Sequence, residues 1–390
     1  MGRLASSSLV LALVLSACSD DGSEGASAPS KDDGGSKDAA AGGSAGSGGS
    51  GGKPNQPDAG SGGATMDSGS PDIPQKLSET GLFADLATET LGDGVRAYEP
   101  RYKLWSDGAV KRRWFRLPPG AKIDTTDMDF WKYPVGTTAW KEFALDGKKL
   151  ETRMLRKLGP KASDWLMLAY QWNDAQTEAT ALPDGAENVA GTPHDIPSSA
   201  DCQQCHGNMK DRLLGVSAIQ LSHQLGGMTI TDLISEDALS DPPPGAFTIP
   251  GPSVDEQALG YLHANCGHCH NGVSAVSASV DVRFWELTGK LSTVEDTEGY
   301  RTTVLQPNSF KQEWHVIEPG DPDHSELFYR ISRRGGGQMP PLATEFVDPD
   351  GMAAIRAFIE SMPRVPRDGG AEGGAPDSGS GGPADAATKD

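Results

Sequence analysis

Two short segments with the same pattern, Cys-x-x-Cys-His, constrain this 390-residue chain more than any other feature of its sequence. One runs from Cys202 to His206 and the other from Cys266 to His270. The chain holds five cysteines, and four of them belong to these two segments. The fifth, Cys18, lies close to the N-terminus. Outside the two segments there is no pair of cysteines that could form a structural disulfide. The chemistry of the segments themselves therefore has to explain why thiols occur there.

The Cys-x-x-Cys-His pattern is typical of covalent attachment of a c-type haem. The two thiols add to the vinyl groups of the porphyrin, and the histidine that follows them faces the iron. We therefore expect two covalent haems. The expected attachment residues are Cys202, Cys205, Cys266 and Cys269, and the expected iron ligands are His206 and His270.

Two other uses of paired cysteines stay open at this point. A four-cysteine zinc site also uses Cys-x-x-Cys pairs, although zinc ribbons usually place their pairs closer together and need no histidine after either pair. A thioredoxin-like dithiol usually lies in a βαβ unit, and no such pattern surrounds either pair. The sequence favours haem over both.

A methionine far downstream is the expected second ligand of the second haem iron. Met339 follows three glycines and precedes Pro340 and Pro341, which lack amide donors and hold the backbone extended. The alternative is a methionine buried in the core. For the first haem, we expect His223 as the second ligand, on a short helix, with Met228 next; Met209 and a five-coordinate iron are further alternatives.

Two helices are expected around the second motif. Ser253 and Glu256 form a capping-box pattern before a helix that ends near Asn265. Asp348 followed by Pro349 predicts the start of a second helix, with apolar residues at helical spacing up to Met362. Two helices that cross beside a haem are the arrangement of a small all-α cytochrome c. Gly260 would allow a close approach at that crossing.

The part of the chain before the first motif predicts β structure. Four runs rich in aromatic or branched residues lie at short intervals, with turn signals such as Asp146-Gly147 between them. Their ranges are 114–117, 137–145, 151–158 and 165–172. This spacing favours an antiparallel sandwich or a small barrel. His194, in a proline-rich connector, is expected to be a solvated loop residue.

Both ends of the chain differ in composition from the middle. Residues 1–18 carry Arg3, a short apolar run and Leu15-Ser16-Ala17-Cys18, which together indicate a signal peptide with a lipoprotein box. We expect Cys18 to be lipidated and the chain to be anchored to a membrane. Residues 19–75 and 368–390 are rich in Gly, Ser, Ala and Asp, which predicts disorder.

The net charge of −20 argues against a nucleic-acid partner, because phosphate binding needs clustered Lys and Arg. The densest basic run contains Lys111, Arg112, Arg113 and Arg116, interrupted by Trp114 and Phe115. We interpret this run as an amphipathic strand with one solvated face.

The motifs also carry a resemblance. Residues 261–270, Glu318-Pro319-Gly320-Asp321-Pro322 and Gln338-Met339-Pro340-Pro341-Leu342 resemble the cytochrome c domains of exported bacterial c-type cytochrome lipoproteins. Residues 104–112, 133–137 and 151–155 resemble an uncharacterised β-rich region found before such haem motifs. The resemblance implies an α+β multidomain chain, in which a β-rich, sandwich-like N-terminal domain precedes a mainly α cytochrome c-like region, with disordered tails.

The expected domains follow from these patterns. They are a signal peptide (1–18), a linker (19–75), a β-rich domain (76–190), a first haem-binding segment (191–250), a cytochrome c domain (251–367) and a tail (368–390). Three functions stay open. They are a lipid-anchored electron carrier of the bacterial cell envelope with a redox partner protein, a dihaem oxidoreductase with substrate chemistry at the first haem, and a sensor or binding module whose β-rich domain recognises a ligand that the haems report. The first is favoured, on the periplasmic or cell-surface face.

Overall fold

The computed structural model describes residues 73–308, 310–311 and 313–366. These residues belong to a single compact unit that spans 68–390. The predicted signal peptide, the lipidated Cys18, nearly all of the linker and the C-terminal tail lie outside the described residues.

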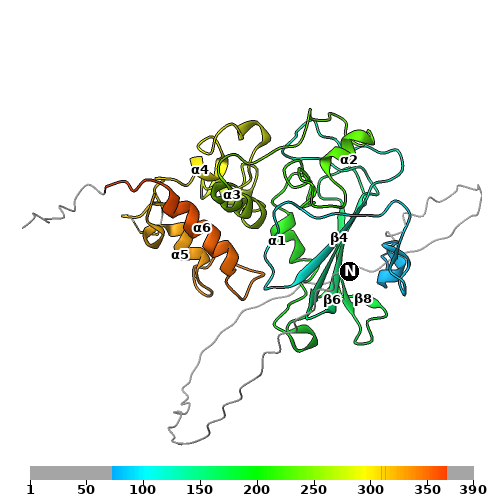
Figure 1. Ribbon diagram of the computed structural model, residues 1–390. Coiled ribbons are helices and arrows are strands. Elements are labelled where there is room, and N and C mark those ends of the chain that lie inside the picture. The colour runs from blue at the N-terminus through cyan, green and yellow to red at the C-terminus, as the bar shows by residue number, and fades with distance from the viewer. Residues whose placement is uncertain (1–72, 309, 312, 367–390) are drawn as a thin grey trace, which may run out of the picture. The chain divides into compact units, whose positions relative to one another are not determined.

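An antiparallel sheet of six strands dominates the first half of the described chain, and its strands follow one another in sequence order (Figure 1). They are β3 (Arg96–Ala97), β4 (Val110–Arg116), β5 (Thr138–Leu145), β6 (Lys148–Lys157), β7 (Trp165–Trp172) and β8 (Ala179–Ala181). A separate hairpin pairs β1 (Phe83–Asp85) with β2 (Thr90–Leu91). Asp146 and Gly147 join β5 to β6 with φ values of 49° and 78°, as a tight hairpin requires. The four predicted strands are confirmed.

The predicted sandwich or barrel is wrong, because no second large sheet covers this one in the described residues. One face of the sheet packs against the N-terminal segment: Trp114, Trp140 and Met154 share a buried cluster with Leu77 and Leu82. The opposite face packs against the chain that follows the first Cys-x-x-Cys-His segment. The β1–β2 hairpin and the segments beside it therefore cover one face of the sheet, and loops and short helices cover the other.

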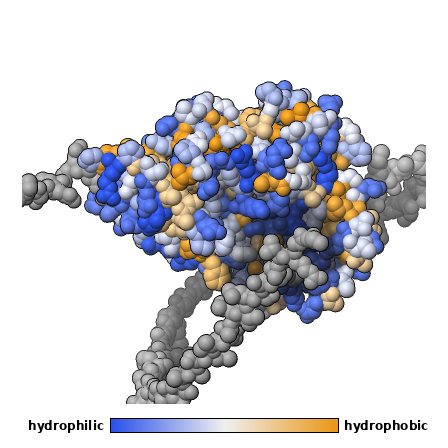
Figure 2. Space-filling view, viewed as in Figure 1, coloured by the Kyte–Doolittle hydropathy of each residue, from blue (hydrophilic) through white to orange (hydrophobic). Residues whose placement is uncertain are grey.

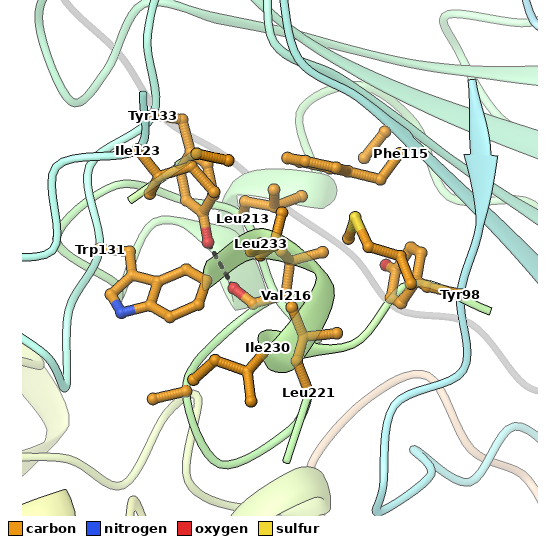
Figure 3. Packing of buried hydrophobic residues seen from close by; sticks show 14 of the residues in the cluster. Tyr98, Phe115, Ile123, Trp131, Tyr133, Leu213, Val216, Leu221, Ile230 and Leu233 are labelled. Carbon is orange, nitrogen blue, oxygen red and sulfur yellow. Dashed lines mark hydrogen bonds between the residues drawn. The ribbon is translucent and has the colours of Figure 1, made fainter. Parts of the chain in front are cut away.

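The opposite face forms the larger buried cluster, part of which is drawn in Figure 3. Phe115 of β4 packs there with Val216, Leu221 and Ile230. The hydroxyl of Tyr133 donates a hydrogen bond to the carbonyl of Val216, which joins the sheet side to the later segment. Ile219 and Ile249 belong to a different cluster, shared with the C-terminal helices. The expected haem-binding segment 191–250 thus divides its apolar residues among neighbouring cores.

After β8, the described chain consists of helices joined by long irregular loops. The helices are α1 (Cys202–His206), α2 (Ile230–Ser235), α3 (Ser253–Asn265), α4 (Glu298–Arg301), α5 (Glu326–Ile331) and α6 (Pro349–Ser361). Short 3-10 turns lie at Leu77–Glu79, Val189–Gly191, Ala275–Ala278, Thr288–Lys290 and Pro322–His324. The α+β character is confirmed, but loops take up too much of this region to describe it as mainly helical. None of the described helices combines the length and apolarity that crossing a membrane would require.

Helices α3 and α6 cross closely because a glycine lies at the contact. A Cβ atom on Gly351 of α6 would overlap the ring of Tyr261 of α3. Gly260, the glycine expected at this crossing, instead faces the ring of Tyr102, which comes from the segment before β4. The close approach that the sequence predicted therefore exists, but the two glycines serve different contacts.

The starts of these two helices differ in how well the sequence predicted them. Asp348 caps α6 as expected, because its carboxylate accepts hydrogen bonds from the amides of Asp350 and Gly351. The capping box at Ser253 is wrong, since Ser253 is already the first helical residue and makes no capping bond. Glu256 instead accepts hydrogen bonds from Arg101 at 2.6 Å and from the hydroxyl of Tyr102 at 3.1 Å. A long-range ion pair thus takes the place of the local cap.

The surface shown in Figure 2 is mixed in character. Hydrophobic residues lie in small groups among hydrophilic ones, and a strongly hydrophilic area occupies the middle of the view. Single exposed apolar residues of this kind are normal for a folded chain.

Candidate functional site

The two Cys-x-x-Cys-His segments lie side by side. Asn208, just after α1, places its amide nitrogen 3.8 Å from the sulfur of Cys269. Asn271, just after the second motif, donates to the carbonyl of Asn208 at 3.4 Å and lies 3.7 Å from the sulfur of Met209. Ser274 donates to the side chain of Asn208 at 3.2 Å. Two segments far apart in sequence thus form one site: Cys202 of α1 packs against the sheet cluster, and Asn208, just after α1, contacts Cys269 of the second motif; α1 is labelled in Figure 1.

The histidine of each segment is held in the same way. Nδ1 of His206 lies 2.5 Å from the carbonyl oxygen of Arg212, and Nδ1 of His270 lies 3.2 Å from that of Val282. A carbonyl acceptor at Nδ1 fixes the tautomer and leaves Nε2 as a ligand. Burial lowers the pKa of both imidazoles, that of His206 to about 4, so each is neutral at pH 7. Both side chains fit the role of an axial iron ligand.

The four cysteines are free thiols and half-buried. Burial raises the pKa of Cys266 to about 12 and that of Cys269 to about 11, and it also raises the pKa of Cys202 and Cys205. A reactive redox dithiol needs a lowered thiol pKa. The environment of both pairs therefore argues against a thioredoxin-like function. Within the described residues, no three His, Cys, Asp or Glu side chains gather into a group that could hold a metal ion.

Met339 packs against the buried cluster that also contacts Cys266. Its backbone amide donates to the carbonyl of Arg330 at 3.1 Å, which ties the loop to the end of α5. The side chain is half-buried. The loop thus brings Met339 and Cys266, far apart in sequence, to the same core.

His223 does not face the first motif as a free ligand. Its Nε2 donates to the carbonyl of Glu99 at 2.6 Å, and its Nδ1 accepts from the amide of Leu225 at 3.0 Å. The residues around it form an irregular turn, so the predicted helix is wrong. With both ring nitrogens engaged, His223 is a poor candidate for an iron ligand in this structure. Met228 is buried in the cluster against which Cys202 packs. Met339 and Cys266 likewise pack against one shared cluster.

His223 instead lines an open groove of about 660 Å³ that the sequence did not predict. Arg101, Tyr102, Leu225, Glu256 and Tyr261 also line it. No sequence signal could have found the groove, because its walls come from three distant segments.

His194 is buried rather than solvated, so that expectation is wrong. Only 8 % of the residue is exposed, and its Nε2 lies 2.8 Å from a carboxylate oxygen of Glu151 on β6. Glu151 also accepts two hydrogen bonds from Arg153. The carboxylate is fully buried, which explains why it needs partners on both sides.

A buried ion pair, also missed by sequence reasoning, anchors the chain after the first motif. Lys157 at the end of β6 and Asp211 are each 2 % exposed at the side chain and form a hydrogen-bonded pair. Trp165 and the backbone amide of Tyr133 donate to the same carboxylate, each at 2.7 Å. The next residue, Arg212, supplies the carbonyl that holds His206. The sheet therefore positions the first histidine through Asp211.

Comparison of the chain with protein-family models, with curated proteins and with solved structures gave no significant match.

Proposed function

We propose that this chain carries two covalently attached c-type haems and serves as an electron carrier of the bacterial cell envelope. The observation that supports this most is the adjacent placement of the two Cys-x-x-Cys-His segments, each with its histidine held through Nδ1 and its Nε2 left as a ligand. A bound haem supplies a one-electron couple at its iron.

The residues of the chain would bind each haem and bury it from solvent. Cys202 and Cys205, and likewise Cys266 and Cys269, would fix each porphyrin through thioethers. Met339 would complete the ligands of the second iron, and its packing against the cluster that Cys266 also contacts supports this role. Outer-sphere electron exchange needs ligation, burial and position rather than acid–base groups. We further propose that a lipid on Cys18 tethers the body to a membrane, where it meets a redox partner protein.

Counting covalent haems tests this proposal. Exported full-length protein should give two haems per chain by pyridine haemochrome, and the Cys202→Ser/Cys205→Ser variant should give one. The Cys18→Ser variant is a matched control, because it should keep both haems and lose only its membrane association. Exported protein without covalent haem would refute the proposal.

A dihaem oxidoreductase is the second candidate, and one observation favours it. Both ring nitrogens of His223 are engaged, so the position opposite His206 lacks its expected ligand. An open position on an iron can accept a small molecule. Carbon monoxide added to the reduced protein should leave the spectrum unchanged if the chain is only a carrier with two complete ligand sets. A change equivalent to one haem would favour the oxidoreductase.

A further inference from the structure

Three cationic side chains lie directly opposite one another on the central strands of the sheet. Arg113 of β4 pairs in register with Lys141 of β5, and Lys141 pairs in register with Arg153 of β6. Side chains directly opposite one another on antiparallel strands lie on the same face. Like charges in such positions repel, so a row of three destabilises the sheet unless an anion lies nearby. We name Arg113, Lys141 and Arg153 the cationic row.

The neighbouring carboxylates only partly neutralise this row. Arg113 is 4 % exposed at its side chain, its nearest carboxylate oxygen, on Glu99, is 3.6 Å away, and its Nη1 has no hydrogen-bond partner. Arg153 is paired with Glu151, but Glu151 also serves His194.

Lys141 is the least compensated member of the row. It has neither an ion pair nor a hydrogen-bond partner within the described residues. Its ammonium lies 4.7 Å from the centre of the Phe143 ring, and the guanidinium of Arg153 lies 4.3 Å from the same ring. A half-buried ammonium beside a second cation, with only an aromatic ring for support, calls for an anionic partner.

The row faces the first Cys-x-x-Cys-His segment. The next residues along the same face of the sheet include Phe115, Ala139 and Leu155, whose cluster also contacts Cys202. The side-chain nitrogen of Gln203, within the segment, lies 3.8 Å from the sulfur of Met167, which pairs in register with Leu155 on this face. The sequence predicted that the basic residues of this strand form a solvated face. Arg113 is instead buried, on the face of the sheet that packs against this site.

We propose that Arg113, Lys141 and Arg153 form the binding site for the two propionate carboxylates of the porphyrin attached at Cys202 and Cys205. This inference rests on the proposed haem attachment. Guanidinium groups bind carboxylates through paired hydrogen bonds, and an ammonium adds a point charge. The β-rich domain thereby gains a role: it supplies the counter-charge of the first haem. A free inorganic anion is the other source of the same chemistry, and the experiment below separates the two.

A redox titration of the mature dihaem protein tests the site. Positive charge next to a haem favours its reduced state, so Lys141→Met should lower the midpoint potential of the first haem more than that of the second. Lys141→Arg should restore the potential, because it restores the charge. Lys148→Met is the matched control: it removes the same charge from β6 at an exposed position paired with Asp174, and it should shift neither potential.

Thermal unfolding gives a second, independent measurement. In the mature protein, Lys141→Met should lower the unfolding midpoint, because the carboxylates lose a partner. In a Cys202→Ser/Cys205→Ser background, which lacks the first haem, the same substitution should leave the midpoint unchanged or raise it, because it relieves repulsion within the row. The loss or reversal of the effect in this background is not expected if Lys141 has only a packing role.

Three outcomes would overturn the inference. Unchanged potentials in a dihaem Lys141→Met protein would show that the row does not contact the haem. A shift of the wild-type potential on adding inorganic phosphate, absent from Lys141→Met, would show that the row holds a free anion. Wild-type protein without covalent haem would refute the proposed function itself and remove the occupant of the site.

Discussion

Replacing Asp211 with alanine is expected to lower the free energy of unfolding by about 3–5 kcal/mol, because it leaves a buried lysine without its counter-ion. The carboxylate of Asp211 accepts hydrogen bonds from Lys157, Trp165 and the amide of Tyr133, and the side chains of Lys157 and Asp211 are nearly inaccessible to water. Urea denaturation followed by tryptophan fluorescence measures the change.

The effect of this substitution should reach the first haem site. Arg212, next to Asp211, holds His206 through its carbonyl, so loosening this segment should disturb the first haem and spare the second. The Asp211→Leu/Lys157→Met double variant should recover most of the lost stability, because it removes both charges together. Lys122→Met is the control: it breaks an exposed ion pair with Asp237 and should change stability little. A loss below about 1 kcal/mol for Asp211→Ala would contradict the assigned role of the pair.

If the proposed second haem has Met339 as its ligand, replacing Met339 with alanine is expected to lower the midpoint potential of that haem by roughly 0.1 V or more, within the range of about 0.8 V over which axial ligands set haem potentials. Methionine ligation raises the potential relative to other ligands. The charge-transfer band near the red end of the visible spectrum, which reports methionine ligation, should also disappear. A redox titration with visible spectra measures both effects.

Met352 provides the matched control for Met339. It is also half-buried and packs against the same cluster as Cys266, so Met352→Ala removes a similar volume from the same core. That variant should lose some stability but keep the band and the potential. If Met339→Ala and Met352→Ala behave alike, Met339 is a core residue and the second iron has another ligand.

The features that the sequence predicted correctly depend on neighbouring residues. Strands β5, β6 and β7 could be predicted because their apolar and branched residues lie between strong turn signals. A turn such as Asp146-Gly147 determines its hairpin from neighbouring residues alone. The start of α6 could be predicted because the carboxylate of Asp348 accepts hydrogen bonds from amides only two and three residues away. The four motif cysteines and their histidines were assigned from spacing alone. Their covalent chemistry stays a prediction.

Three of the wrong predictions involve partners far along the chain. His194 was expected in solvent, but Glu151, 43 residues earlier, draws it into the core. Glu256 was expected to cap its own helix, but Arg101 and Tyr102 bind it instead. His223 was expected on a short helix, but it lies in an irregular turn, where its ring binds the carbonyl of Glu99. In each case a polar group found a partner in a distant segment, and for His194 burial made that partner necessary.

The sequence by itself therefore determined which residues can carry the chemistry, and the tertiary structure decided how they are combined. Cys202–His206 and residues 266–270 are recognisable wherever they lie, because attachment needs only a fixed local spacing. Their adjacency, the anchoring of His206 through Asp211 and the cationic row on β4, β5 and β6 come from strand register and long-range packing. Such contacts form only in the folded chain, because they join distant segments. The local sequence of one segment does not indicate which other segment it will contact.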